Sequence, residues 1–165
     1  MSAWHANYAI MNEDIDILTC YLAVHPVTSL LEFGPGRSTK FFAEQGLKRI
    51  VTFEHDTQYI GIANNHLGHF PAVKIYRYFN DNVGIAEPEG LEHHFDLGFV
   101  DGPSYSEPFS RAHSCDFVSR RCKAWFLHDS ARDGEKMTLE RFKQRGWKVT
   151  QYPTPRGLAL VEKGT

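Results

Sequence analysis

The fold is indicated most clearly by two neighbouring segments of the chain, Thr28-Ser-Leu-Leu-Glu-Phe-Gly-Pro-Gly-Arg-Ser-Thr39 and Arg49-Ile-Val-Thr-Phe-Glu54. A short apolar run ends in a Gly-x-Gly turn at Gly34 and Gly36, and a helix-like segment follows before a second apolar run. This order of strand, glycine turn, helix and strand with a terminal acid suits a ligand that carries a ribose. The glycines let the backbone approach the ligand, and the acid accepts hydrogen bonds from both ribose hydroxyls.

The spacing within this stretch separates two kinds of ligand. Glu54 lies about 20 residues beyond the first glycine, as in dinucleotide-binding folds. Thr39, however, stands where the third glycine would let a pyrophosphate rest on the helix N-terminus. The turn therefore fits an adenosyl ligand without a pyrophosphate better than it fits NAD.

Along the rest of the chain, strand-like and helix-like segments alternate. We expect strands at 28–33, 49–54, 73–79, 97–100, 124–127, 148–152 and 158–162, and helices at 12–24, 38–46, 57–67, 108–122 and 135–145. Such alternation predicts an α/β fold, a three-layer Rossmann-like sandwich around a mostly parallel sheet. The loop before the last strand is too short for a crossover, so the last of the seven strands should be antiparallel.

Composition limits the possible functions. The 165 residues, 42% of them hydrophobic, predict one domain, 1–165, with an N-terminal segment and helix at 1–27 and a core at 28–165. A net charge of −2 gives no general attraction to nucleic acid or to an anionic membrane. The three cysteines form no C-x-x-C pair, which indicates reduced thiols in a cytoplasmic protein. The sequence has neither a signal-peptide pattern nor an apolar run long enough to cross a membrane.

Three motifs in register carry a family resemblance. They are Leu31-Glu-Phe-Gly-Pro-Gly-Arg-Ser-Thr39, Thr52-Phe-Glu-His-Asp56 and Phe95-Asp-Leu-Gly-Phe-Val-Asp-Gly-Pro103. Together they resemble class I S-adenosylmethionine-dependent methyltransferases, in particular a small branch with a Gly-x-Gly-x-Ser-Thr turn and an Asp-Gly pair at the fourth strand. The resemblance implies S-adenosylmethionine as the cofactor and a seven-stranded sheet whose last strand is antiparallel.

Ligands of open α/β sheets bind beyond the carboxyl ends of the strands, so we assign the cofactor to residues at those ends. These residues are Glu32, Phe33, Gly34, Gly36, Ser38, Thr39, Glu54, His55, Asp81, Asn82 and Asp101. The Ser38 and Thr39 hydroxyls and nearby amides would hold the methionine carboxylate, unless Ser38 is only a helix N-cap. Glu54 would bind the ribose, with a surface salt bridge as its alternative. Asp81 and Asn82 would reach the adenine amino group, with a plain Asx turn as their alternative.

Asp101 and Asp129 each follow an apolar strand, and we expect both to face one crevice beside the reactive methyl group. Two such carboxylates can hold Mg²⁺ or another divalent cation, which would lower the pKa of a substrate hydroxyl. In the metal-dependent, catechol-type relatives, an acid at strand four and an Asp-Asn pair after strand five hold the ion. Here Ser130 replaces the Asn. The alternative for Asp129 is a cap of the helix that begins near Gly134.

His128 is the candidate general base if no metal is bound, because imidazole titrates near neutral pH. Neighbours on a regular strand face opposite ways, so His128 and Asp129 can both serve the site only if the strand has already ended. The short Asp-Gly-Pro and His-Asp-x-x-Arg segments are also similar to those of plant glucuronoxylan O-methyltransferases, which modify a sugar acid.

The function that these residues favour is methylation of an oxygen on a small molecule or sugar. Nitrogen-directed nucleic-acid relatives carry an Asn/Asp-Pro-Pro-Tyr/Phe motif, and Asp101-Gly-Pro-Ser replaces it here, so no nucleic-acid partner is expected. The alternatives are a nucleotide-sugar or NAD-type oxidoreductase and a non-catalytic ligand-binding domain with the same fold. Trp4, Tyr8 and Ile10 lie in an N-terminal segment that looks exposed, which predicts a homodimer or a lid formed by residues 1–11.

Overall fold

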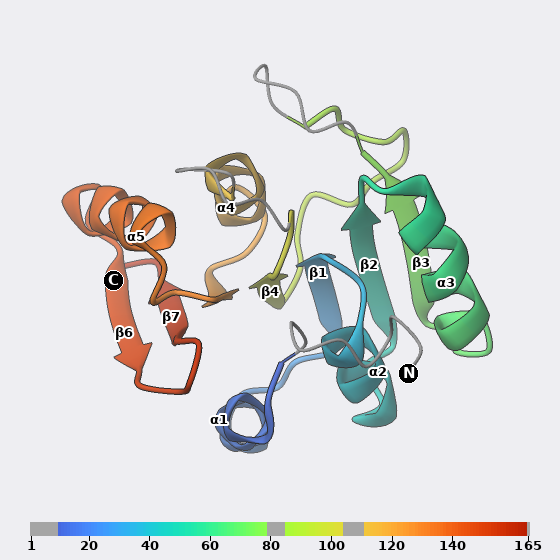
Figure 1. The fold of residues 1–165 in the computed structure, drawn as a ribbon, viewed down its shortest axis with the longest axis horizontal. Helices are drawn as coiled ribbons and strands as arrows, with labels where there is room; N and C mark the ends of the chain where they lie inside the picture. The colour runs from blue at the N-terminus through green and yellow to red at the C-terminus, as the bar shows by residue number, and fades with distance from the viewer. Residues whose placement is uncertain (1–9, 79–84, 104–110, 165) are drawn as a thin grey trace.

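The protein is an α/β sandwich in the computed structural model, which describes residues 10–78, 85–103 and 111–164 (Figure 1). The elements in chain order are α1 (Asn12–Val24), β1 (Ser29–Phe33), α2 (Arg37–Glu44), β2 (Arg49–Glu54), α3 (Thr57–Leu67), β3 (Val73–Arg77), β4 (Leu97–Val100), α4 (Ala112–Ser119), β5 (Ala124–His128), α5 (Asp133–Gln144), β6 (Lys148–Tyr152) and β7 (Leu158–Glu162). The predicted alternation of strands and helices is confirmed. None of the helices in these three ranges is both long and apolar enough to cross a bilayer.

The sheet has seven strands in the order β3-β2-β1-β4-β5-β7-β6. All neighbouring pairs are parallel except those of β7, which is antiparallel to β5 and to β6. The predicted antiparallel last strand is therefore confirmed. The chain winds outward from β1 to β3 and then returns to β4 on the other side of β1. The carboxyl ends of β1 and β4 thus flank the switch point at which open α/β sheets bind ligands.

Alternating strand residues supply the two hydrophobic faces of the sheet. Leu30 and Ile50 face α1 and α2, where Leu18 and Phe42 complete one buried cluster. Leu31, Phe33, Val51 and Phe53 face the opposite side, packed with Phe117 of α4 and Phe142 of α5. The helices α1, α2 and α3 cover one face and α4 and α5 the other, which makes the predicted three layers (Figure 1). Because β1 is buried along its whole length, its end is a rigid support for a site.

Several predicted boundaries shift by a few residues. β5 runs one residue further than expected, through His128, and α5 begins at Asp133 rather than at 135. Gly36 is the N-cap of α2, so the alternative in which Ser38 caps this helix is wrong. Asp129 does not cap α5 either, since the N-cap there is Arg132.

The prediction for the N-terminal segment can be checked only in part, because the described residues begin at Ile10. Ile10 is buried in the cluster under α1, so the prediction that it is displayed on the surface is wrong. Trp4 and Tyr8 lie outside the described residues, as do Asp81 and Asn82. The lid or homodimer that depends on the N-terminal segment stays a prediction, and so does the single-domain division of the chain.

Candidate functional site

The glycine turn after β1 packs directly on the turn after β4. Gly34 has φ +89°, and a Cβ at this position would lie 2.9 Å from the backbone oxygen of Asp101. A Cβ on Gly102 would in turn lie 3.1 Å from the backbone nitrogen of Gly34. Glycine is required at Gly34 both by its left-handed backbone and by this contact between two strand ends. The first glycine of the motif thus serves the protein's own packing.

The second glycine of the turn is different. Gly36 is extended, with φ −178°, and among the described residues the nearest heavy atom to a Cβ placed there would be the Tyr59 hydroxyl oxygen, at 3.7 Å. Neither the backbone conformation nor packing against the described residues therefore requires glycine at this position. Free space beside a backbone at a helix N-terminus is what a closely approaching anionic or polar ligand needs. Tyr59, whose pKa is raised to about 12 by burial and by nearby carboxylates, faces the same space from α3.

The Ser38 and Thr39 side chains are directed into the protein. Ser38 Oγ donates to Glu32 Oε1 at 2.6 Å, and Thr39 Oγ1 donates to Glu32 Oε2 at 2.5 Å. Thr39 Oγ1 also accepts from the Gly36 backbone nitrogen at 2.8 Å. Burial raises the pKa of Glu32 to about 7, although these hydroxyls counteract the shift. Glu32 therefore anchors the turn from below, and the hydroxyls expected to meet a ligand hold this carboxyl group instead.

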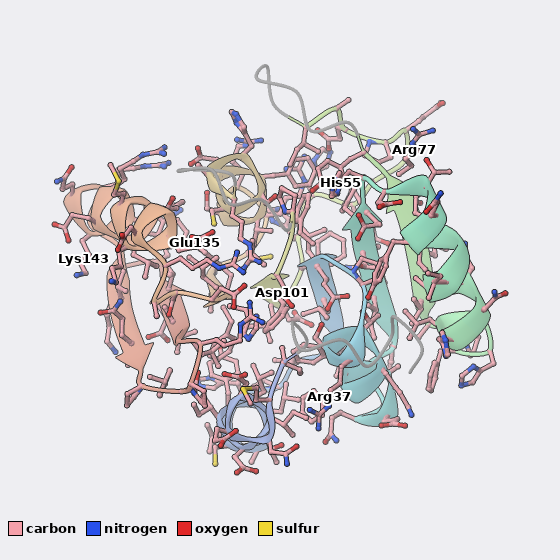
Figure 2. The ribbon with its side chains drawn as sticks, in the orientation of Figure 1. Arg37, His55, Arg77, Asp101, Glu135 and Lys143 are labelled. Carbon is pink, nitrogen blue, oxygen red and sulfur yellow. The ribbon has the colours of Figure 1, made fainter. Side chains whose placement is uncertain are left out.

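Glu54 ends β2 as predicted and is buried there. Its Oε1 accepts from the backbone nitrogens of His55 at 2.7 Å and Asp56 at 2.9 Å, and His55 Nδ1 lies 2.9 Å from the same oxygen. Burial raises the pKa of the Glu54 carboxyl group, and these donors oppose the rise. The contacts fix the orientation of the carboxylate at the carboxyl edge, the placement that a ribose-binding acid requires. The neighbouring His55 is labelled at this end of β2 in Figure 2.

The predicted pair at the ends of β4 and β5 does converge. Asp101 lies near the middle of the sheet, and its Oδ1 is 2.8 Å from Nδ1 of His128 (Figure 2). His128 is completely buried, which alone would lower the pKa of the imidazole, but Asp101, Asp14 and Asp129 raise it to about 9. The ring is therefore charged at neutral pH. A charged, buried imidazole cannot remove a proton, so the general-base hypothesis for His128 does not fit this geometry.

Asp129 reaches the same cluster because the chain turns there. Its φ is +57°, a left-handed conformation that Asp tolerates better than most residues. The turn ends β5 and brings Asp129 Oδ1 within 3.7 Å of His128 Nδ1. The condition set by the sequence, that the strand must end between these two residues, is met.

Three arginines neutralise the Asp129 carboxylate. Arg111 Nη2 lies 3.0 Å and Arg132 Nη2 lies 2.7 Å from Oδ2, while Arg156 Nε lies 2.5 Å from Oδ1. Arg111, itself buried, also donates to the backbone oxygens of His128 at 2.7 Å and Pro103 at 3.2 Å. Its guanidinium further lies 3.3 Å from Asp101 and 3.7 Å from Glu135 of α5. Arg111 thus joins the ends of β4, β5 and α5.

This donor set does not fit a divalent cation. One ligand atom each from Asp101, His128 and Asp129 lies within 4.8 Å of the others, which is a suitable spacing for an ion. Yet both Asp129 oxygens already contact guanidinium groups, and the imidazole is held in its protonated form. A metal would have to displace arginines and a proton from a buried cluster whose acids are already paired with cations.

The structure brings together most of the predicted residues and adds others. Glu32, Phe33, the glycine turn, Glu54, Asp101, His128 and Asp129 all lie at or just beyond the carboxyl ends of β1, β2, β4 and β5. Sequence reasoning missed Asp14, Tyr59, Arg111 and Arg156 as parts of this edge. The available signal was an arginine just before the α4 pattern and one of two adjacent acids in the first turn of α1, and each also occurs in solvated helices.

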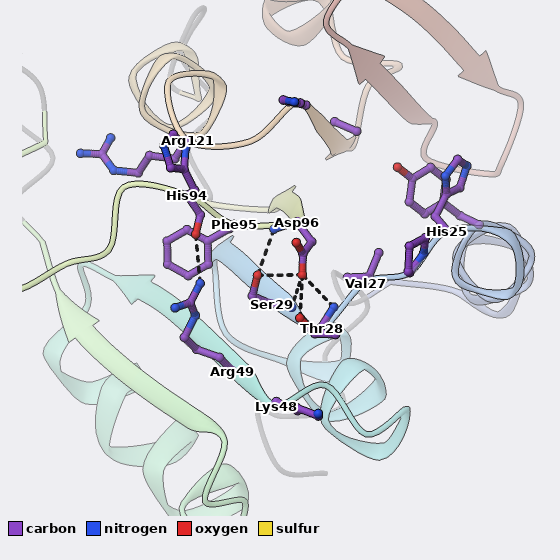
Figure 3. A pocket seen from close by; sticks show the side chains of 14 residues that line it. His25, Val27, Thr28, Ser29, Lys48, Arg49, His94, Phe95, Asp96 and Arg121 are labelled. Carbon is purple, nitrogen blue, oxygen red and sulfur yellow. Dashed lines mark hydrogen bonds between the residues drawn. The ribbon is translucent and has the colours of Figure 1, made fainter.

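A groove of about 920 Å³ lies at the opposite, amino edge of the sheet (Figure 3). Its lining includes the exposed lysines Lys48 and Lys123, the Tyr21–His25 ring stack and Asp96. Asp96 Oδ2 accepts four hydrogen bonds, from the backbone nitrogens and hydroxyls of Thr28 and Ser29. None of the predicted site residues lines this groove. This groove and the predicted site residues therefore lie on different edges of the sheet.

Comparison with known proteins shows the fold. No protein-family model and no curated protein matches the chain. Among solved structures, a Podospora anserina methyltransferase with S-adenosylhomocysteine bound aligns at TM-score 0.72 and 16% identity, over 97% of this chain and 82% of that one. The O-methyltransferase TomG of tomaymycin synthesis from Streptomyces achromogenes, in complex with S-adenosylmethionine, aligns at 0.68 and 16%, over 97% and 83%. An rRNA methylase from Streptococcus thermophilus aligns at 0.63 and 18%, over 95% and 100%. The chain shares its Rossmann-like, seven-stranded fold with these methyltransferases.

Proposed function

We propose that this protein is an S-adenosylmethionine-dependent methyltransferase that acts on an oxygen of a small molecule or sugar. The observation that carries the proposal is the convergence, at one edge of the sheet, of the open space beside Gly36, the fixed Glu54 carboxylate and the Asp101–His128 pair. Solved structures that share the fold and hold S-adenosylmethionine or S-adenosylhomocysteine support this class of cofactor.

The residues present fit the cofactor in the following way. The space at Gly36 admits the ligand, the backbone amides at the start of α2 would bind its carboxylate, and Glu54 would accept from its ribose hydroxyls. The role of Asp81 and Asn82 at the adenine belongs to the same proposal. Bound S-adenosylmethionine supplies an electrophilic methyl group, and the protein must add only an oriented acceptor and a place for its proton.

Asp101 is the residue that we assign to the acceptor's proton. Among the described residues, its contacts with His128 and Arg111 involve Oδ1, and its side chain is 16% exposed. Oδ2 is then the oxygen that accepts the proton of an acceptor hydroxyl within hydrogen-bond reach. The two cationic partners fix the plane of the carboxylate, so that Oδ2 keeps its direction toward the acceptor.

The donor chemistry of the turn weighs against a dinucleotide. Thr39 Oγ1 accepts from the Gly36 backbone nitrogen and donates to Glu32, so its side chain occupies the place where a third glycine would expose backbone. An NAD-type oxidoreductase is therefore the weaker reading. A non-catalytic binding domain would bind the cofactor in the same way and is separated from the enzyme only by turnover.

Titration calorimetry with S-adenosylhomocysteine tests the proposal. Glu54→Ala should lose affinity by about tenfold to a few hundredfold, because hydrogen bonds to a charged acceptor contribute roughly 1.5–3 kcal/mol. Glu44→Ala is the matched control, since Glu44 is an exposed acid at the end of α2 that pairs with the exposed Lys40. Mass spectrometry of nucleoside released from the denatured protein gives a second readout. Release of NAD, or equal affinity in wild type and Glu54→Ala, would overturn the assignment.

Metal addition tests the arginine-filled acid cluster separately. We expect Mg²⁺ or Mn²⁺ to leave the melting temperature unchanged, because the cluster already contains its cations. Methyl transfer should likewise survive exhaustive chelation. A metal-dependent rise in melting temperature that disappears in Asp129→Asn would restore the metal site at Asp101 and Asp129.

A further inference from the structure

The first turn of α1 carries a charged residue into the interior. Asp14 and Leu18 are the two buried residues of this helix, and Asp14 has no exposed surface. Leu18 packs on the sheet, as the inner face of an amphipathic helix does. A buried carboxylate costs several kcal/mol unless it is paired, so the position of Asp14 needs an explanation.

Helix capping accounts for only part of the surroundings of Asp14. Its Oδ2 accepts from the Met11 backbone nitrogen at 2.8 Å, a contact that closes the first turn. Capping acids do not need burial for this role. The same oxygen lies 3.4 Å from Nε2 of His128, which is equally buried. The second contact joins α1 to the end of β5.

His128 is thus held from both sides of its ring. Nε2 faces Asp14 of α1, and Nδ1 faces Asp101 after β4 at 2.8 Å. The other charged groups around it are Asp129, 3.7 Å from Nδ1, and Arg111, which donates to the His128 backbone oxygen at 2.7 Å. The imidazole is within hydrogen-bond distance of Asp101 at Nδ1 and within ion-pair distance of Asp14 at Nε2, so the ring cannot rotate without losing one partner.

We propose that Asp14 is a positioning residue of the active site, which acts through His128 to hold the Asp101 carboxylate toward the acceptor. The proposal rests on the role given above to Asp101 in methyl transfer. In this proposal α1, which precedes the glycine-turn motif, supplies a residue that positions the site. With Asp14 neutral, His128 keeps one strong partner, gives up its proton more easily and orients Asp101 less firmly.

Nuclear magnetic resonance of the His128 ring is the first test. In the wild type at pH 7.5, we expect both ring nitrogens to carry protons. Asp14→Asn keeps an oxygen for the Met11 amide and removes the charge, so the acid dissociation constant of the ring should rise about tenfold or more. Asp16→Asn, an exposed acid on the same helix, is the control and should leave the titration unchanged. A neutral ring in the wild type, or an unchanged titration in folded Asp14→Asn, would overturn the proposal.

Kinetics give the second test. We expect Asp14→Asn to lower kcat about tenfold or more with little change in KM for S-adenosylmethionine, and to move the alkaline limb of the rate profile to lower pH. Wild-type kcat and an unmoved limb in this variant would reject the role of Asp14. The wild-type ring measurement decides the case if Asp14→Asn does not fold. Failure of the wild type to bind S-adenosylhomocysteine would instead reject the proposed function, so the two failures are distinguishable.

Discussion

The two edges of the sheet both carry acids that meet cations, but they do so in opposite surroundings. At the carboxyl edge, four acidic groups (Asp14, Asp101, Asp129 and Glu135) meet His128 and three arginines, and most of these side chains are buried. At the amino edge, Arg49 and Arg121 line an open groove (Figure 3), and they pair with the exposed acids Glu92 and Glu87 respectively. Buried charges must satisfy one another and so fix their geometry, whereas exposed pairs remain adjustable and contribute little.

This difference indicates which edge of the sheet is the better candidate for a functional site. The groove at the amino edge is large, but two of its arginines pair with exposed acids and its Asp96 links the starts of β1 and β4. At the carboxyl edge, more of the charged side chains are buried and paired with one another. We therefore expect substitutions at this edge to have larger effects than substitutions beside the groove.

Replacing one arginine at each edge should give the largest difference in stability between the two edges. Arg111→Met leaves three acids at the carboxyl edge without their buried guanidinium, so we expect a loss of about 3–5 kcal/mol in the free energy of unfolding. Arg49→Met at the amino edge removes an exposed pair and should cost less than about 1 kcal/mol. Urea unfolding followed by tryptophan fluorescence measures both. Equal losses would mean that burial does not distinguish the two edges.

The two glycines of the turn, both at the carboxyl edge, should differ in whether their substitution affects stability or ligand binding. Gly34→Ala should cost about 1–3 kcal/mol of stability, because it strains a left-handed backbone and crowds the Asp101 carbonyl. Gly36→Ala should change stability little but weaken S-adenosylhomocysteine binding about tenfold or more, because the new methyl group enters the ligand's space. Thermal unfolding and calorimetry separate the two effects. Normal binding by Gly36→Ala would show that the space beside it is not the cofactor's.

The buried titrating groups predict that stability falls as pH rises. The pKa of Glu32 is raised by burial from 4.5 to about 7, and that of His128 is raised from 6.5 to about 9 against the effect of its burial. In both cases the folded state binds more protons than the unfolded state, so stability is lost between these values as pH increases. Melting temperatures from pH 5 to pH 9 should therefore decline. Glu32→Gln should flatten the decline below pH 7 and leave the part above it, whereas a decline identical to wild type would contradict the role of Glu32.

The smallest effect is expected at the amino edge. The double variant Lys48→Glu, Lys123→Glu reverses two exposed charges that line the groove. We expect unchanged melting temperature and unchanged affinity for S-adenosylhomocysteine, since the candidate site lies at the other ends of the strands. Calorimetry of this variant beside wild type provides the measurement. A clear fall in affinity would link the groove to the cofactor.

The parts of the fold and site set by local pattern could be predicted from the sequence. Mostly apolar runs of four to six residues between glycines and polar turns placed β2, β4 and β7 at their observed bounds. The rule that ligands meet parallel strands at their carboxyl ends also brought Asp101 and Asp129 to one cluster, as observed.

The parts that depend on tertiary burial could not be predicted. Asp14 and Arg111 resemble ordinary charged residues of solvated segments, and only packing against β5 reveals them as members of the cluster. The charge on His128 likewise follows from three acids that lie far apart in the chain. Ser38 and Thr39 had two possible acceptors, an external ligand or the buried Glu32, and the pattern alone did not choose between them.

The charge cluster at the carboxyl edge also implies an order in which parts of the site form during synthesis. Asp14 lies near the start of the described chain, while Arg156 lies in the turn between the last two strands and contacts Asp129. A chain that is made amino end first therefore contains Asp14 and Asp129 before Arg156 has been added. Until the hairpin of β6 and β7 docks, Asp129 lacks its contact with Arg156, and the ends of the strands are not yet fixed. Competence of the site should thus be among the last properties that the new chain acquires.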